Sequence, residues 1–242
     1  MAKFGMAGVP RLIALGLALI VCAASSAATP AAANREEGAA QFGQYCARCH
    51  GLQGKGNANR AIPALAGQRY AYLVRQIAAF STEARDSATM HNVVSQQPLR
   101  DLQVRVNIAA YLSGLEPLAS PATGDGTNVA LGRGIFHEQC ASCHRADARG
   151  SGAVPSLRNQ HYTYLIVQLH KIGSGFRHDI DENIARFLRS LDDRDVNATA
   201  DYLSRLRGPG KIRTEAHSGG APAGAKAATE GGAAKQVDAA KE

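Results

Sequence analysis

The sequence predicts an all-α fold built from two tandem copies of one small domain, and two observations support this prediction. The first is an internal duplication between residues 34 and 207, in which landmark residues recur at matching spacings. The second is that apolar side chains recur every three or four residues, as they do along one face of a helix. Each copy is therefore about 80 residues of helix and loop.

The first 33 residues predict an export signal rather than part of the fold. Lys3 and Arg11 precede an apolar run over residues 12–24, and small residues follow up to a cleavage site after Ala28 or Ala33. A retained membrane anchor is the alternative, although a span needs about 18 or more apolar residues. Export agrees with an extracytoplasmic protein.

Each copy then begins with a helix whose Gly-x-x-x-Phe pattern leads into a Cys-x-x-Cys-His pentapeptide. Two thiols one helical turn apart can each form a thioether with a haem vinyl group, and the adjacent histidine can bind the iron. A redox dithiol or a zinc site is the alternative, but zinc would require the two clusters to converge on one ion. We therefore predict two covalently attached haem c groups. The attachment residues are Cys46, Cys49 and His50 in the first copy, and Cys140, Cys143 and His144 in the second.

A glycine-rich loop, a Pro-x-Leu segment and two further helices complete each copy. The loop glycines align as Gly54-Lys55-Gly56 with Gly150-Ser151-Gly152. In the first copy the helical apolar faces comprise Leu73, Ile77 and Phe80, and then Ile108, Tyr111, Leu112 and Leu115. So small a domain buries little surface, and the chain has no tryptophan. We expect haem to supply much of each core.

The remaining segments and the charge exclude several classes of protein. Prolines and glycines make residues 119–128 a linker between domain 1 (34–118) and domain 2 (129–207), and the Ala/Gly/Lys-rich tail (208–242) is predicted to be disordered. Of the seven net positive charges, two lie in the signal and one in the tail. The four that remain, without clustered basic and aromatic residues, give no case for nucleic acid binding. Cys22 leaves with the signal, so no thiol is spare for catalysis.

The sequence resembles dihaem cytochromes c of the cytochrome c4 type, in which two class I cytochrome c domains are fused in tandem. The resemblance covers about residues 36–206 and rests on the two haem motifs, the helices before them, the Pro-x-Leu segments and the closing Ala-x-Tyr helices. It implies that Pro63 and Pro155 lie on the proximal side, where a carbonyl orients each histidine. It also implies periplasmic electron transfer, often to a terminal oxidase.

The resemblance implies a methionine as the distal ligand of each iron, in the loop before the closing helix. Met90 is the sole methionine outside the signal and lies 40 residues after His50, so we predict that it binds the first iron; His91 is a competitor. No methionine follows it, and Glu182 falls opposite Met90 within a residue or so. For the second iron we predict His178, with an open or water-bound iron as the alternative. The other candidate histidines are His137, His161 and His170.

These ligands predict an electron carrier whose partners are redox proteins such as a membrane oxidase, a reductase complex or a periplasmic dehydrogenase. Methionine ligation raises the reduction potential relative to bis-histidine ligation, so electrons are expected to run from domain 2 to domain 1. Two alternatives remain: a permanent electron-accepting subunit of a dehydrogenase, and an enzyme with an open second iron and Glu182 as acid–base group. A tail that acts as a tether would allow peripheral membrane association.

Overall fold

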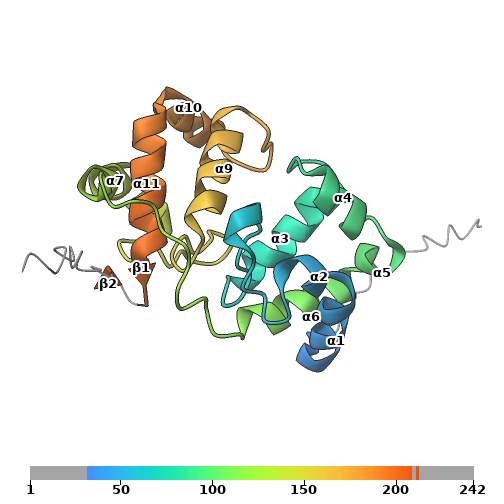
Figure 1. The fold of residues 1–242 in the computed structure, drawn as a ribbon. Coiled ribbons are helices and arrows are strands. Elements are labelled where there is room, and N and C mark those ends of the chain that lie inside the picture. Colours follow the sequence, from blue (N-terminus) through green and yellow to red (C-terminus); the bar gives the residue numbers. More distant parts are fainter. Residues whose placement is uncertain (1–31, 209–210, 213–242) are drawn as a thin grey trace, which may run out of the picture.

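The computed structural model describes residues 32–208 and 211–212 of the chain. Two helical bodies lie next to each other in Figure 1, the first coloured blue to green and the second green to orange. The all-α prediction is confirmed, and the described part contains one sheet, a pair of two-residue strands. The predicted export signal and nearly all of the predicted tail lie outside the described residues.

The first body contains six α-helices and one short 3₁₀ helix. Their order is α1 (Arg35–Tyr45), α2 (Ala47–His50), η1 (Ala58–Arg60), α3 (Tyr70–Ser81), α4 (Ala88–Val94), α5 (Gln97–Arg100) and α6 (Leu102–Ser113). The second body follows a similar plan, but its described residues include no 3₁₀ helix and one α-helix fewer, and one π-helical turn, η2, replaces the end of its first helix. Its order is α7 (Val129–Ile135), η2 (Phe136–Cys140), α8 (Ala141–His144), α9 (Tyr162–Gly173), α10 (Glu182–Ser190), α11 (Asp193–Arg205), β1 (Leu206–Arg207) and β2 (Lys211–Ile212).

In each body the first and last helices cross at a glycine. A Cβ atom on Gly38 of α1 would overlap the carbonyl of Asn107 on α6, and one on Gly132 of α7 would overlap the carbonyl of Ala198 on α11. The Gly-x-x-x-Phe pattern is thus explained: glycine lets the two backbones touch, and the phenylalanine four residues later enters the core on the same face.

A matching aromatic pair closes each core. The rings of Phe42 and Tyr111 lie with their centroids 5.6 Å apart, and those of Phe136 and Tyr202 lie 5.6 Å apart with nearly the same tilt. Both phenylalanines are fully buried. The phenylalanine and tyrosine that recur in the two copies of the sequence therefore pack in the same way in both bodies.

The loop after each haem motif corrects one alignment made from sequence. The Gly56 N–H donates to the His50 carbonyl at 2.9 Å, and the Gly150 N–H donates to the His144 carbonyl at 2.8 Å. Gly56 and Gly150 are therefore equivalent, and the second copy has Ala148 where the first has Gly54. The loop in the second copy is shorter, so matching glycine to glycine along the sequence shifted the alignment by two residues.

The segment predicted as a linker is bound to the second body. Asp201 on α11 accepts from the N–H groups of Gly124 and Gly126 at 3.0 and 2.7 Å, and it pairs with Arg205 at 2.8 Å. Arg205 in turn donates to the Gly124 carbonyl at 2.7 Å. These contacts bind the backbone of the connection to α11 through two buried side chains.

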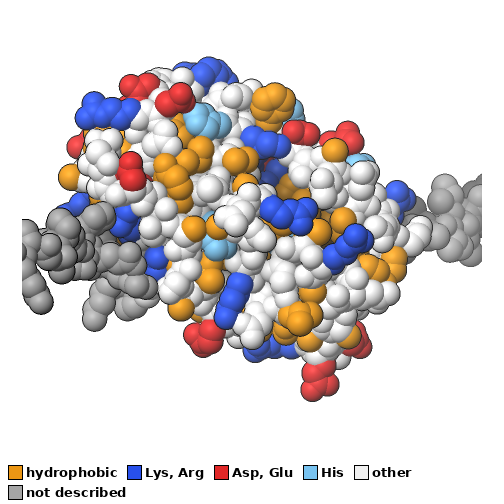
Figure 2. Space-filling model, in the orientation of Figure 1, with side chains coloured by type: hydrophobic (Ala, Val, Ile, Leu, Met, Phe, Trp, Pro, Cys, Tyr) orange, Lys and Arg blue, Asp and Glu red, His pale blue; other side chains and the backbone are white. Residues whose placement is uncertain are grey.

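Acidic and basic side chains are interspersed on the face that Figure 2 shows, which fits the modest net charge. Among residues 32–208 and 211–212, no helix is long and apolar enough to cross a membrane. The acidic run at the start of α11 is explained by capping, because the side chain of Asp192 accepts from the Asp195 N–H at 2.8 Å.

Candidate haem sites

Each Cys-x-x-Cys-His motif forms a single helical turn at the end of the first helix of its body. In the first body Cys46 precedes α2, and its carbonyl accepts from the N–H groups of Cys49 and His50 at 3.1 and 3.0 Å. The second motif folds in the same way around α8. This turn brings two thiols to one side of the helix with the histidine next to them, which is the arrangement that two thioether bonds and an axial ligand require.

Both histidines are oriented by a proline carbonyl. Nδ1 of His50 lies 3.2 Å from the Pro63 carbonyl oxygen, and Nδ1 of His144 lies 3.1 Å from that of Pro155. A carbonyl can only accept, so each Nδ1 carries the proton and each Nε2 presents its lone pair. Burial lowers the pKa of both imidazoles, although the carbonyls act in the opposite direction. Both rings are thereby held in the neutral form that binds a metal, and the expected role of the two prolines is confirmed.

The first cysteine of each motif lies in surroundings that favour the protonated thiol. Burial, and secondarily the neighbouring cysteine, raises the pKa of Cys46 to about 12 and that of Cys140 to about 11. Zinc requires deprotonated thiols. Among the described residues, no group of three or more His, Cys, Asp or Glu side chains could hold a metal ion. The two cysteines and the histidine of each motif are therefore residues that would hold a covalent haem, and they do not fit a zinc ribbon.

Met90, the predicted distal ligand of the first iron, is the third residue of α4. The side chain of Ser87 caps this helix and accepts from the Met90 N–H at 3.4 Å. Met90 is half-buried, and α4 packs on α3. Its neighbour His91 is engaged at both ring nitrogens. Nδ1 lies 3.0 Å from the Phe80 carbonyl oxygen, and Nε2 lies 3.4 Å from the Ser95 hydroxyl oxygen and 3.6 Å from the Glu83 carboxylate. Of the two predicted candidates, Met90 is the one whose side chain is free of hydrogen bonds in the described structure.

The corresponding helix of the second body starts later than the sequence alignment implies. Glu182 is the first residue of α10, capped by Asp181, and its carboxylate lies 3.9 Å from Arg189 on the surface. Counted from the caps, the position equivalent to Met90 is Ile184, which is 45% exposed. Its aliphatic side chain cannot bind iron. By either alignment the second body therefore has no methionine at this position.

His161 is excluded as an alternative ligand because both of its ring nitrogens are hydrogen-bonded. Nδ1 accepts from the Ala122 N–H at 3.2 Å, and Nε2 lies 3.0 Å from the Lys55 carbonyl oxygen in the first body. The side chain is buried and connects linker, α9 and first body. His161 is thus a structural residue of the domain interface.

Two further histidines are also paired, and one is not. Nε2 of His137 lies 3.1 Å from the Tyr202 hydroxyl, and Nε2 of His170 lies 3.8 Å from Asp193. His178 is exposed and, within the described residues, makes no hydrogen bond or ion pair. It lies in the loop before α10, between two residues that are buried in the domain interface.

The comparisons with known proteins agree with this geometry. The model of the Cytochrome c family matches residues 35–116 and again residues 129–207, which together form both helical bodies. The chain belongs to the cytochrome c family.

Its relatives narrow this assignment. The cytochrome is 32% identical over 191 residues to a cytochrome c4 of Stutzerimonas stutzeri, covering 70% of this chain and 90% of that protein. It is 29% identical over 207 residues to a cytochrome c4 of Pseudomonas aeruginosa, covering 81% and 98%. The crystal structure of reduced recombinant cytochrome c4 from Pseudomonas stutzeri superposes with a TM-score of 0.64 at 27% identity, covering 73% and 100%. The cytochrome is therefore of the dihaem c4 type, with two covalently bound haem c groups.

A second similar structure belongs to an enzyme. A thiosulfate dehydrogenase of Marichromatium purpuratum superposes with a TM-score of 0.61 at 27% identity, covering 81% of the cytochrome but only 44% of that chain.

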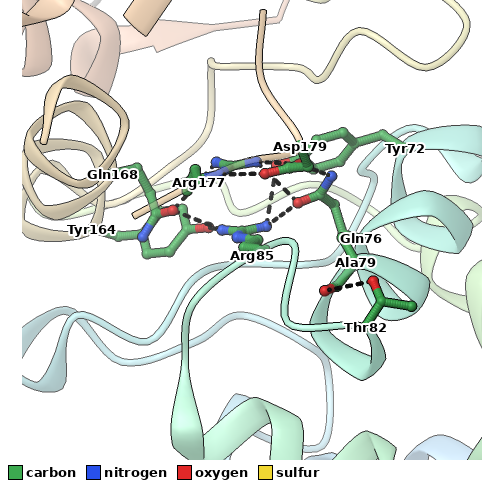
Figure 3. Close-up of polar contacts among 9 residues, drawn as sticks. All are labelled: Tyr72, Gln76, Ala79, Thr82, Arg85, Tyr164, Gln168, Arg177 and Asp179. Carbon is green, nitrogen blue, oxygen red and sulfur yellow. Dashed lines mark hydrogen bonds and ion pairs between the residues drawn. The ribbon is translucent and has the colours of Figure 1, made fainter. Parts of the chain in front are cut away.

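A buried polar cluster joins the two bodies of the cytochrome (Figure 3). Arg85 from the first body and Arg177 from the second lie opposite each other in an isolated antiparallel bridge. Arg85 donates to Tyr164 at 2.6 Å and Gln168 at 2.8 Å across the interface, and it also contacts Gln76 of its own body. Arg85 thus binds both repeated glutamines and a tyrosine, whereas Arg177 binds both glutamines and Asp179.

Asp179 is the one carboxylate in this cluster. It accepts from Arg177 at 2.9 and 3.0 Å and from Gln76 at 2.8 Å, and Gln76 in turn accepts from Arg177 at 3.0 Å. Burial alone would raise the pKa of Asp179, but hydrogen bonds and charge from Arg177 outweigh it and lower the pKa overall. The two bodies are therefore joined by buried, charge-assisted hydrogen bonds.

The sequence alone assigns no role to the residues of this cluster. Gln76 and Gln168 occupy matching positions of the two copies, and so do Arg85 and Arg177. A signal was present: glutamine and arginine recurred at fixed positions next to apolar helix faces. Such residues need buried partners, and the second copy could have been proposed as the source.

Proposed function

We propose that this cytochrome is a periplasmic electron carrier that passes single electrons between a donor protein and an acceptor such as a terminal oxidase. The observation that carries the proposal is the repetition of one complete proximal site in two bodies that are joined by buried polar contacts. Cysteine pair, histidine and orienting carbonyl recur in both. A fixed spacing between two redox centres suits transfer from one to the other and then to a partner.

Met90 and His178 are proposed as the distal ligands. Met90 is supported by its position on α4 and its lack of a competing hydrogen bond, and His178 by the engagement of the other three candidate histidines. Methionine raises the potential of the first haem relative to a bis-histidine centre. Electrons are then expected to enter at domain 2 and leave from domain 1.

Reconstitution tests the carrier role directly. Reduced cytochrome is added to membranes of the source organism, and its reoxidation is followed by absorbance together with oxygen uptake. The proposal expects catalytic, cyanide-sensitive turnover that falls when Met90→Ala alters the first haem. A matched control is His170→Ala, which changes an exposed histidine on the second body. A cytochrome that no membrane or soluble fraction can reoxidise would contradict the carrier role.

The periplasmic location is supported by the predicted signal over residues 1–33 and by the cysteine usage. A variant that lacks residues 2–33 should accumulate in the cytoplasm without covalent haem, whereas the full chain should appear in the periplasmic fraction. Haem attached to the truncated variant would refute the location.

A dehydrogenase subunit is the second candidate, and the similarity to part of a thiosulfate dehydrogenase favours it. The two roles differ in whether the cytochrome has a permanent partner. Gel filtration of a periplasmic extract distinguishes them: a free carrier elutes near its own mass, and a subunit co-elutes with a dehydrogenase activity. An enzyme with an open second iron would instead bind carbon monoxide at that haem without displacing a protein ligand.

A further inference from the structure

Two glutamines connect the bodies through reciprocal pairs of hydrogen bonds. Gln160 of the second body accepts from the Ala64 N–H at 2.9 Å and donates to the Ala64 carbonyl at 2.9 Å. Gln68 of the first body does the same with Ser156, accepting from its N–H and donating to its carbonyl, both at 2.9 Å. The side-chain amide of each glutamine thus pairs with the backbone of a residue in the opposite body.

The residues that these glutamines bind lie in the peptide groups that orient the proximal histidines. The Ala64 N–H and the Pro63 carbonyl belong to one planar peptide group. That carbonyl lies 3.2 Å from Nδ1 of His50, while the N–H donates to Gln160. In the second body Nδ1 of His144 lies 3.1 Å from the Pro155 carbonyl. The N–H of the same peptide group, on Ser156, donates to Gln68.

We propose that Gln160 and Gln68 are cross-domain positioning residues, each of which sets the reduction potential of the haem in the opposite domain. The path is a chain of two hydrogen bonds through one peptide group, from histidine to proline carbonyl and from the following N–H to glutamine. Because the peptide is planar, holding the N–H also fixes the direction of the carbonyl.

The chemistry gives the effect a sign. A peptide whose N–H donates a hydrogen bond is polarised, and its carbonyl becomes a better acceptor. A better acceptor draws the histidine proton away and makes the imidazole a more basic ligand. A more basic ligand stabilises ferric iron and lowers the potential. Loss of the glutamine should therefore raise the potential of the haem in the other domain.

Both glutamines have an additional partner, and it does not change the argument. Gln160 Oε1 also accepts from the His161 N–H at 3.0 Å, and Gln68 Oε1 accepts from the Arg69 N–H at 2.8 Å. These bonds lie within the glutamine's own domain and orient its amide toward the opposite body. Gln160 is itself buried, so its bonds to Ala64 are shielded from water.

The test is a pair of uncharged variants of the holoprotein, Gln160→Met and Gln68→Met, with potentials measured by spectroelectrochemical titration. The domain 1 haem is identified by the hyperfine-shifted proton resonances that move in Met90→Ala, and the domain 2 haem by those that do not. We expect Gln160→Met to change the reduction equilibrium constant of the domain 1 haem about threefold, a rise of about 30 mV at 59 mV per tenfold for one electron. Gln68→Met should instead raise the reduction potential of the domain 2 haem.

Thr163→Val is the matched control. Thr163 also donates across the interface, to the Ala58 carbonyl at 2.6 Å, but its bond does not involve a proximal peptide group. The control should leave both potentials unchanged. If Gln160→Met does not fold, Gln160→Glu is used instead. Glutamate keeps an acceptor opposite the Ala64 N–H, so the reduction potential of the domain 1 haem should not rise. A shift in the mutated domain itself, an equal shift of both haems, or no shift at all would overturn the proposal. The experiment requires only that both motifs carry haem, so its outcome is independent of whether the cytochrome is an electron carrier.

Discussion

Replacing Asp179 with asparagine should destabilise the pairing of the two domains by about 3 kcal/mol. The side chains of Arg177 and Asp179 are 4% and 6% exposed, and the carboxylate is the one anion beside two buried guanidinium groups within the described cluster. Removing one partner of a buried ion pair typically costs about 3–5 kcal/mol, because the remaining charge is left without compensation. Asparagine retains one acceptor, which places the expectation at the lower end.

Asp86→Asn provides the control, because Asp86 pairs across the same interface on the surface. Its carboxylate lies 3.3 Å from Lys171, with the two side chains 55% and 32% exposed, so its loss should cost about 1 kcal/mol or less. Urea unfolding of both holoproteins, followed by far-ultraviolet circular dichroism and haem absorbance, measures the difference. Equal costs for the two variants would refute the conclusion that Asp179 compensates buried charge.

Acid should expose the same interaction. The pKa of Asp179 is lowered in the folded protein, so its carboxylate contributes its full stability above the unfolded value of about 3.9. That contribution is lost as the pH falls through the lower folded pKa. Wild-type stability should therefore decline toward acid more steeply than that of Asp179→Asn, and parallel profiles would contradict the assignment.

Three further changes test local features of the fold and the second iron. Arg145 follows the second haem motif at φ 67° and ψ 156°, a region that is essentially restricted to glycine and that Gly51 occupies after the first motif. Arg145→Gly should therefore stabilise the second domain by about 1 kcal/mol in thermal unfolding. A loss of stability in this variant would contradict the backbone strain at Arg145. Gly38→Ala should lower the free energy of unfolding by about 2 kcal/mol or more, because the new Cβ atom overlaps the Asn107 carbonyl. Gly43→Ala, on the same helix but facing open space, should raise it by up to about 1 kcal/mol. Similar urea midpoints for the two variants would contradict the close helix crossing. His178→Ala should convert the second haem to a high-spin spectrum and His170→Ala should not, and an unchanged low-spin spectrum would exclude His178 as the ligand.

The sequence predicted what is local to each copy. The cysteine pairs, the histidines and the Gly-x-x-x-Phe helices before them follow from short motifs whose geometry is set by nearby residues. The resemblance to the family predicted that a proline carbonyl orients each histidine, and this prediction is confirmed in both bodies.

What could not be predicted depends on contacts between distant segments. The pairing of Gln160 with Ala64 and of Arg85 with Tyr164 arises only when the two bodies dock, and no periodicity within one copy encodes the relative position of the other. The later start of α10, which places Ile184 rather than Glu182 at the position of Met90, depends on where Asp181 caps the helix. Spacing along the chain cannot show such a shift.

Low-temperature electron paramagnetic resonance of the oxidised holoprotein at neutral pH tests the central claim most directly, because it reports the ligands of both irons at once. Two low-spin ferric signals, one of histidine–methionine type and one of bis-histidine type, are the predicted result for a dihaem electron carrier with Met90 and His178 as distal ligands. A high-spin signal that accounts for one of the two haems would contradict it and would identify the second iron as an open, ligand-binding site.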